Sequence, residues 1–496
     1  MPDYLLGIDN GGTVSKAALF TPGGREVAVA SRKVQVLEPQ PGWSERDMDD
    51  LWRATAAAVR EVLTRSKVKP ESIACVAPTG HGNGLYLVDK AGRAVRHAIY
   101  STDARAQAYS DRWLADGLGP KVLPMTAQCI WAAQPNALLA WLRDREPAVL
   151  KRAAHVLMCK DFVRLRLTGE VRAEITDMSG TSLMNVVTGQ YDDRILRLFG
   201  LEDLRGLLPP LAKSADLCGQ VTARAAKETG LKAGTPVAGG LFDIDACALA
   251  SGLVDEKLMS LVAGTWGNHL FVSKKPLIDR DLCMTSCFCI PGHYLVLEGS
   301  PTSASNLEWF LREWLGAGGK GGATYDLCNR LVASVPPEDG GVLFLPFLYG
   351  SNAGPRAKAC LIGLQARHTK AHAMRAVYEG IVFSHYTHYR RLLKFRKAPR
   401  SVRFTGGAAR SAVWVQTFAD CFQVPMEIPA GTELGALGAA IGAAVAAGIH
   451  RDYRTAVGAM TRVARRCEPD PKRRNLYAER YAAYRSAVQA LSGFWA

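Results

Sequence analysis

The chain has 496 residues, more than a single hydrophobic core usually supports, so we expect two domains. Hydrophobic residues make up 48% of the chain, as in soluble globular proteins, and no stretch stays apolar long enough to span a bilayer. Its first residues show neither a secretory signal nor a transit-peptide pattern. We therefore expect a cytoplasmic protein without a membrane partner.

The charge balance is basic, with 61 Lys and Arg against 46 Asp and Glu, a formal net charge of +15. Nucleic acid is therefore a partner class to consider. The basic residues are dispersed, however, and the densest run, residues 388–400, has only two interleaved aromatic side chains. We expect this run to be a solvated helix face and the protein to bind no nucleic acid.

Twelve cysteines are scattered along the chain, which favours reduced thiols over a disulfide framework. The one cluster, Cys283, Cys287 and Cys289, has a spacing that matches no zinc or haem motif. Cys287 and Cys289 lie two apart in a strand-like run, so we expect small apolar side chains on one face of a strand.

The first half of the chain alternates strands and helices. Residues 4–9 and 16–20 read as strands joined by an Asn-Gly-Gly-Thr turn, and the second strand ends at a Gly-rich turn. Helical periodicity follows over 48–63 after an acidic segment, and further strands are expected at 73–80 and 85–89. This pattern is typical of an α/β fold.

The second half begins with a comparable arrangement. A strand over 235–243 ends at a carboxylate, residues 258–273 form two strands joined by a Gly-Thr turn, and 294–300 is another strand. A strand and glycine turn follow at 402–410, and 435–448 is a helix of small residues that can pack closely on a sheet. We therefore predict two similar lobes, 1–240 and 241–496, with the boundary near 235–245.

The first hairpin turn is a candidate phosphate-binding loop. Asp9 ends its first strand, Gly11 and Gly12 let backbone N–H groups approach phosphate oxygens, Thr13 adds a hydroxyl and Lys16 a positive charge. A carboxylate at this place can hold Mg²⁺, usually through water. An ordinary type I′ hairpin would explain the same residues.

Two further glycine turns support the phosphate interpretation. Gly264 and Thr265 form a second Gly/Thr turn, and two such turns could clamp a triphosphate. Gly406, Gly407 and Ala408 follow a strand and would let a flat base lie against the backbone. The alternative for the last turn is an ordinary connection from strand to helix.

Two carboxylates compete for the role of general base. Asp243 ends a predicted strand, where side chains are presented at the edge of a sheet, and an Asp is the usual acceptor of the alcohol proton in phosphoryl transfer. Asp245 would point the same way if the strand continued. If a helix starts at once, either residue could instead cap it or place charge in its first turn. The residues alone do not choose between them.

Polar turns in the first half suit a polyhydroxylated substrate. Asn83 lies in a run of glycines, and Asp103 and Arg105 follow another strand. Turn chemistry and a surface ion pair between Asp103 and Arg105 are the structural alternative. His81 has no second histidine nearby at ligand spacing, so we do not assign it a catalytic or metal-binding role.

Many segments of the chain, taken in sequence order, resemble segments of the FGGY carbohydrate kinases. These kinases share the sugar kinase, actin and heat-shock ATPase (ribonuclease H-like) fold. GIDNGGTVSKAALF resembles the first phosphate motif and AGTWGNHL the second, AGGLFDIDACALASG the segment with the catalytic Asp, and FTGGAARSAVWVQTFAD the adenosine motif. Within the family, PQPGWSERDMDDLW and SPTSASNLEWF resemble L-xylulose kinases. Asn83-Gly84 stands where glycerol kinases carry Arg-Glu, which argues against glycerol.

The resemblance implies an ATP- and Mg²⁺-dependent kinase, a homodimer as in relatives, acting on a terminal hydroxyl of L-xylulose. D-Xylulose, erythritol or another small polyol or keto sugar is the alternative acceptor. A non-catalytic nucleotide-binding regulator is the alternative outside catalysis, although a chain that only binds has no need of a carboxylate beside two phosphate turns. The implied roles are base for Asp243, metal-associated carboxylate for Asp9, sugar binding for Asn83, Asp103, Arg105 and Asp243, and ATP binding for Gly11, Gly12, Thr13, Lys16, Gly264, Thr265, Gly406, Gly407, Ala408 and Ser411.

Overall fold

The computed structural model describes residues 4–316, 324–351, 353–354 and 356–495. The chain forms two compact units that alternate along the sequence. The first unit comprises Met1–Val254, Val272–Val296 and Gly431–Thr461, and the second comprises Asp255–Phe271, Leu297–Ala430 and Arg462–Ala496. Because the units alternate, they do not test a boundary between two continuous lobes, and the division at residue 240 stays a prediction.

The first sheet carries the predicted N-terminal hairpin. β1 (Tyr4–Asn10) pairs antiparallel with β2 (Val14–Phe20) and parallel with β5 (Ile73–Gly80), as predicted for those three strands. The outer strands are β3 (Glu26–Lys33), β13 (Leu217–Gln220), β14 (Pro236–Ala238) and β15 (Leu241–Phe242), in the order β13-β14-β5-β1-β2-β3 with β15 also on β5. The single strand expected over 235–243 is thus two strands, because the chain turns at Gly240 with a φ of +89°.

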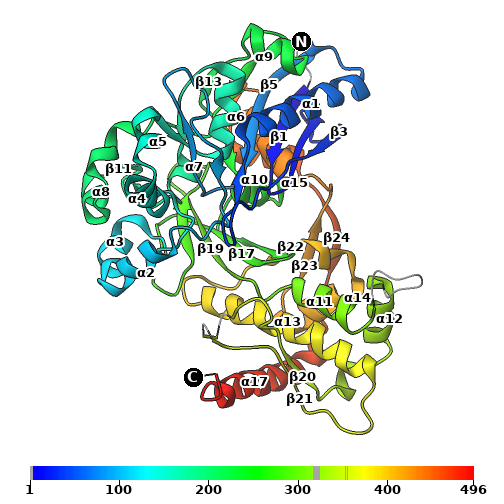
Figure 1. Ribbon diagram of the computed structural model, residues 1–496. Helices are drawn as coiled ribbons and strands as arrows, with labels where there is room; N and C mark the ends of the chain where they lie inside the picture. Colours follow the sequence, from blue (N-terminus) through cyan, green and yellow to red (C-terminus); the bar gives the residue numbers. More distant parts are fainter. Residues whose placement is uncertain (1–3, 317–323, 352, 355, 496) are drawn as a thin grey trace. The chain divides into compact units, whose positions relative to one another are not determined.

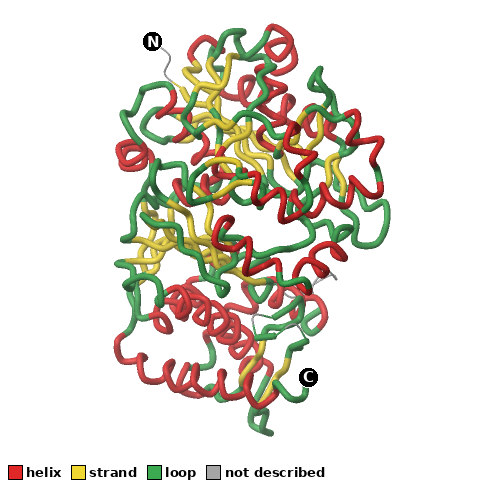
Figure 2. The backbone as a smooth tube through the Cα atoms, turned by 90° about the vertical axis from the view of Figure 1, so that its left-hand side faces the viewer, coloured by secondary structure: helices red, strands yellow, loops and turns green. Residues whose placement is uncertain are grey.

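The second sheet repeats this arrangement. β16 (Leu258–Ala263) pairs antiparallel with β17 (Gly267–Ser273) and parallel with β22 (Ser401–Thr405), just as β1 pairs with β2 and β5. The full order is β18 (Met284–Cys287), β19 (Tyr294–Ser300), β17, β16, β22, β23 (Met426–Pro429) and β24 (Val463–Cys467). Figure 2 shows the strands in yellow. Because the two hairpins pair in the same way, their predicted similarity is confirmed.

Helices surround both sheets. The predicted helix at 48–63 is α1 (Met48–Ser66), capped by the Asp47 side chain, which accepts from two backbone N–H groups. The others near the candidate sites are α3 (Leu118–Thr126), α4 (Pro135–Arg145), α10 (Asp243–Ala250), α11 (Ser305–Glu313), α12 (Tyr325–Ala333), α13 (Lys370–Leu392), α14 (Ala412–Phe422) and α15 (Leu434–Ala446).

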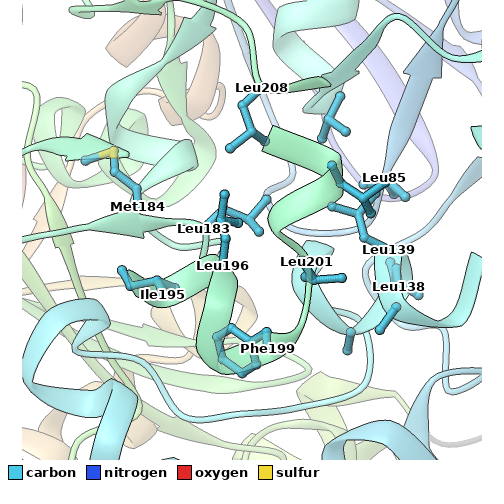
Figure 3. Close-up of a cluster of buried hydrophobic side chains, with 14 of the residues drawn as sticks. Leu85, Leu138, Leu139, Leu183, Met184, Ile195, Leu196, Phe199, Leu201 and Leu208 are labelled. Carbon is cyan, nitrogen blue, oxygen red and sulfur yellow. The ribbon is translucent and has the colours of Figure 1, made fainter. Parts of the chain in front are cut away.

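The first unit has more than one hydrophobic core. One core lies under α1 and the first sheet. Another, drawn in Figure 3, gathers side chains from α3, α4, α8 (Asp193–Phe199) and neighbouring loops, among them Leu138, Leu139, Ile195, Leu196 and Phe199. Burial of these apolar side chains holds the polar turns that carry the predicted sugar-binding residues.

The predictions for the basic run and for the cysteine cluster are both corrected in part by the structure. α13 ends at Leu392, so most of 388–400 is not helical, and His388 is buried among polar side chains. The prediction of a solvated helix face is therefore wrong for this residue. Cys287 and Cys289 are both buried, but β18 ends at Cys287, so Cys289 lies beyond the strand and the prediction of one strand face holds only for Cys287. Within the described residues, no helix is both long and apolar enough to cross a membrane.

The helix of small residues, α15, touches the backbone of two other elements. In Figure 1 this orange helix lies beside the blue strand β1. A Cβ atom added to Gly7 of β1 would overlap the carbonyl of Ala436, and one added to Gly438 would overlap the backbone of Ala246 in α10. Glycine therefore sets how closely α15 packs on β1 and α10.

Replacing Gly438 with Ala should destabilise the protein by about 2 kcal/mol, because the backbone of α10 cannot yield to the added methyl group. Gly442→Ala is the matched control on the same helix, where the added Cβ would meet only the flexible side chain of Leu241 at 2.8 Å. Urea unfolding of both variants checks this. Equal stabilities would show that the close packing of α15 on α10 is not a constraint.

Candidate functional site

Asp9 lies at the end of β1 beside an ion pair. It is opposite Lys16 of β2 in the ladder, and the Nζ of Lys16 is 2.8 Å from Oε2 of Glu433, which precedes α15. Burial raises the pKa of Asp9 to about 6; Lys16 opposes this shift and Glu433 adds to it. A Cβ atom on Gly435 would overlap the Asp9 carboxylate, so the close approach of α15 fixes this group in place.

Asp243 and Asp245 both lie in the first turn of α10, which begins at Asp243. Neither is the N-cap, which is Phe242. Asp245 is 0% exposed, and neither of its carboxylate oxygens has a hydrogen-bond partner among the described residues. Asp243 is partly exposed. Of the two, only Asp243 is open to a bound ligand without rearrangement of the core.

The carboxylate of Asp243 has an acidic neighbourhood. Burial first, and then the charges of Asp9 and Asp177, raise its pKa well above the ordinary value. Lys160 opposes this shift; its Nζ lies 3.3 Å from Oδ2 of Asp177. Like charges held together in this way are typical of functional sites rather than of ordinary cores.

Arg46 binds the first glycine turn through the carbonyl oxygens of that turn. Its guanidinium is fully buried and donates to the carbonyl oxygens of Gly11, at 3.3 Å, and of Gly12. It also lies over the ring of Tyr100 at 4.9 Å. With its carbonyls bound by Arg46, the turn is fixed on one side, and Thr13 at its tip is exposed. Nothing in the sequence around Arg46 predicts this long-range contact.

The predicted sugar-binding turn is tightly shaped. Asn83 has a φ of +58° and Gly84 one of +72°, and the N–H of Gly84 donates to the carbonyl of Ala133 at 3.0 Å. The buried Oδ1 of Asn83 has no partner within the described residues. His81 bonds to the hydroxyl of Tyr86 at 2.8 Å, and burial lowers the pKa of its imidazole to about 3. His81 is thus a neutral structural residue.

Asp103 and Arg105 form an ion pair, as one interpretation expected, but it is not at the surface. Both side chains are 0% exposed, with Nε of Arg105 at 2.9 Å from Oδ1 of Asp103 and Nη2 at 2.8 Å from Glu45. The guanidinium lies 4.0 Å from the ring of Trp43. Its Nη1 has no acceptor in the described part of the chain. The idea of a surface ion pair is therefore wrong.

A pocket of about 610 Å³ lies in the second unit. Predicted residues from two different turns meet here, namely Gly264 and Thr265 with Gly407, Ala408 and Ser411. The remaining lining includes Asn329, Tyr325, Tyr378 and Trp414, and the rings of Tyr378 and Trp414 are stacked with centroids 4.4 Å apart. Such a pocket, with aromatic walls and glycine turns, suits a flat base and its phosphates.

Asn329 connects the walls of this pocket. Its Oδ1 accepts from Ser411 Oγ at 2.6 Å and from the hydroxyl of Tyr378 at 3.0 Å. Ser411 also accepts from the N–H of Trp414 and so caps α14. Asn329 lies within α12, where no motif in the sequence marks it. Gly406 does not line the pocket but supports it, since a Cβ there would lie 2.5 Å from the carbonyl oxygen of Ala263.

The turn at Gly264 and Thr265 is held by residues at the start of α11. The N–H of Ala304 donates to the carbonyl of Gly264 at 2.9 Å, and Ser305 Oγ donates to that of Thr265 at 3.0 Å. Next to them, Ser303 Oγ is 2.9 Å from Nε2 of the buried His385. These bonds use the carbonyls on one side of the turn.

The predicted residues fall into two groups, each within one unit. Asp9, the first glycine turn, Lys16, Asn83, the Asp103–Arg105 pair and Asp243 belong to the first unit. The second glycine turn and the residues from 406 to 411 belong to the second. The first group contains carboxylates and buried polar atoms, and the second lines a pocket of about 610 Å³.

Two family descriptions cover most of the chain. Residues 4–250 match the N-terminal domain, and residues 259–447 the C-terminal domain, of the FGGY family of carbohydrate kinases. Among curated proteins, L-xylulose/3-keto-L-gulonate kinase of Escherichia coli (strain K12) is 39% identical, covering 100% of this chain and 99% of that protein. Probable L-xylulose kinase of Pasteurella multocida (strain Pm70) is 38% identical, covering 99% of each.

Solved structures agree with these relatives. The crystal structure of xylulose kinase from Rhodospirillum rubrum superposes with a TM-score of 0.89 at 27% identity, covering 99% of each chain. The predicted α/β fold class, that of the sugar kinases, is confirmed.

Asp9→Asn should make the protein more stable at neutral pH by about 1–2 kcal/mol, because the ionised carboxylate is costly where it lies. A pKa raised from 3.8 to about 6 means that the folded state holds the proton more tightly than the unfolded state. Stability of the parent chain therefore falls as pH rises through this window, and the gain from Asn is full above pH 6.

Urea unfolding of both proteins at a pH below 3.8 and a pH above 6 checks this, with the difference confined to the higher pH. A variant less stable than the parent at the higher pH would contradict the assigned environment of Asp9.

Proposed function

The chain belongs to the FGGY family of carbohydrate kinases, and we propose that it transfers the γ-phosphoryl group of ATP to a terminal hydroxyl of L-xylulose, forming L-xylulose 5-phosphate. The acceptor is inferred from relatives of 38–39% identity over the full length, whose names both include L-xylulose, one of them together with 3-keto-L-gulonate. The observation that carries the catalytic assignment is the partly exposed Asp243 beside Asp9, at the start of α10.

Asp243 would act as the general base. The attacking hydroxyl must lose its proton during phosphoryl transfer, and a carboxylate within hydrogen-bond reach accepts it. Because burial and neighbouring carboxylates raise its pKa, Asp243 is a stronger base than an ordinary Asp. The complete burial of Asp245 at the first turn of α10 supports Asp243 over Asp245 for this role.

The residues at the end of β1 fit a magnesium ion. Asp9 raises the pKa of Asp243, so a divalent cation near the two carboxylates would relieve their repulsion. Asp9 would hold the ion through water. When bound, Mg²⁺ neutralises charge on the phosphates. Lys16 would provide positive charge at the same turn once its pairing with Glu433 gives way.

ATP would bind with its base in the pocket of the second unit and its phosphates at the glycine turns. The stacked rings of Tyr378 and Trp414, and Gly407, where a Cβ would meet nothing within 4 Å, leave room for a flat base beside the backbone. The turn at Gly264 and Thr265 is held by its carbonyls, and the N–H of Gly264 donates to the carbonyl of Trp266 at 3.2 Å. The N–H of Thr265 would therefore be the one that meets a phosphate oxygen.

The sugar would bind at the polar turns of the first unit. Buried polar atoms without partners are uncommon in native proteins, so a donor on Arg105 and an acceptor on Asn83 that lack them suggest a ligand rich in hydroxyl groups. The charge of Arg105 is already balanced by Asp103 and Glu45. This favours a neutral pentulose over an acid such as a ketogulonate. We further propose a cytoplasmic homodimer, the commonest assembly of soluble enzymes.

A coupled assay of ADP release, run with L-xylulose, D-xylulose, erythritol and 3-keto-L-gulonate, tests the proposal. We expect the highest kcat/KM with L-xylulose. Preference for another of these compounds would overturn the acceptor but not the kinase chemistry. ATP binding without turnover on any sugar would favour a nucleotide-binding regulator.

Asp243→Asn should lower turnover by about 10³-fold, because the proton acceptor is lost while ATP binding in the other unit is untouched. Asp245→Asn is the matched control two residues away and should stay within about tenfold of the parent. Steady-state kinetics and ATP titration of both variants measure this. Near-normal turnover of Asp243→Asn together with a collapse in Asp245→Asn would reverse the assignment.

A further inference from the structure

Two cysteines far apart in sequence face each other across a short antiparallel contact in the first unit. Gln128, between α3 and α4, pairs with Met284 at the start of β18. The N–H of Cys129 donates to the carbonyl of Cys283 at 3.4 Å. The next residues in an antiparallel register are therefore Cys129 and Cys283, directly opposite each other.

The two thiols lie on the same, outer side of this contact. Side chains alternate along a strand, and Gln128 and Met284 are 4% and 8% exposed, whereas Cys129 and Cys283 are both exposed. The Sγ of Cys129 donates to the carbonyl of Leu282 at 3.3 Å, so this thiol leans toward the opposite segment. Small oxidants in solvent can therefore reach both.

The spacing of such a pair is compatible with a disulfide. Residues opposite each other in a hydrogen-bonded antiparallel pair have Cα atoms about 5.5 Å apart, within the range of about 4.4–6.8 Å that a disulfide allows. Their Cβ atoms, at about 4.5–5.5 Å, must approach to about 3.8 Å. We propose that Cys129 and Cys283 form a reversible disulfide that lowers the affinity of the sugar site.

The oxidant would be a low-molecular-weight disulfide such as oxidised glutathione. One cysteine thiolate attacks it and releases one small thiol, and the second thiolate attacks the mixed disulfide and releases another. The two protein thiols thus become one disulfide while the small disulfide becomes two thiols, and the two electrons and two protons balance. Exposed and strained disulfides are easily reduced, so the reaction reverses with excess thiol.

The segment with Cys129 connects to the predicted sugar-binding turn. The side chain of Gln128 donates to the carbonyl of Thr285 at 2.8 Å and to that of Ser179 at 3.3 Å. A few residues on, Ala133 accepts from the N–H of Gly84. Formation of the disulfide would move Cys129 toward Cys283. This movement would strain these hydrogen bonds and displace the turn that carries Asn83. The effect on sugar affinity rests on the proposed function, whereas the disulfide itself does not.

Peptide mapping tests the bond. The full chain is incubated with oxidised glutathione, remaining thiols are alkylated, and the unreduced digest is analysed by mass spectrometry. We expect one linked peptide pair, containing Cys129 and Cys283. Mixed disulfides of single cysteines, with no linked pair, would overturn the proposal whether or not the chain phosphorylates a sugar.

Kinetics test the consequence. Oxidation should raise the KM for L-xylulose by about tenfold, leave that for ATP unchanged, and be reversed by dithiothreitol. Cys129→Ser and Cys283→Ser should each retain the reduced activity and lose the response. Cys360→Ser, which removes a partly exposed thiol in the second unit, is the matched control and should keep it. A linked pair without a change in the sugar KM would overturn control of the sugar site.

Discussion

The close approach of α15 to β1 and α10 is the constraint on which the arrangement of Asp9 and Asp243 depends. Asp9 is the last residue but one of β1 and Asp243 the first of α10, and glycines let α15 touch the backbone of both elements. The same helix brings Gly435 against the carboxylate of Asp9. Two carboxylates are thereby held near each other at a cost in stability, an arrangement typical of functional sites.

The second unit has the same hairpin and parallel strand as the first, but there they form a pocket. A hairpin and a parallel strand place two glycine turns at one pocket, and neighbouring side chains bind the carbonyls of the turn at Gly264. In the first unit, Arg46 does the same for the turn at Gly11 and Gly12. Both glycine turns are thus held through their carbonyl oxygens, as the proposed contacts of their remaining N–H groups with phosphate would require.

Much of the fold and part of the candidate site could be predicted from local sequence patterns. Both hairpins, α1, α15 and the residues around the two glycine turns follow from periodicity and turn chemistry. The choice between Asp243 and Asp245 could not, because it depends on where α10 begins and which side of it is buried. Arg46 and Asn329 were missed because their partners are distant in sequence, and the burial of the Asp103–Arg105 pair depends on Trp43. The sugar-binding and nucleotide-binding roles stay predictions.

Family membership makes the chain a carbohydrate kinase. The central claim is that it transfers the γ-phosphoryl group of ATP to the terminal hydroxyl of L-xylulose. The most direct measurement is ³¹P NMR of the reaction of ATP with L-xylulose carbon-labelled at the terminal position. The account predicts a phosphomonoester signal coupled to that carbon, formed together with ADP. Inorganic phosphate alone, or a phosphate on another carbon, would contradict it.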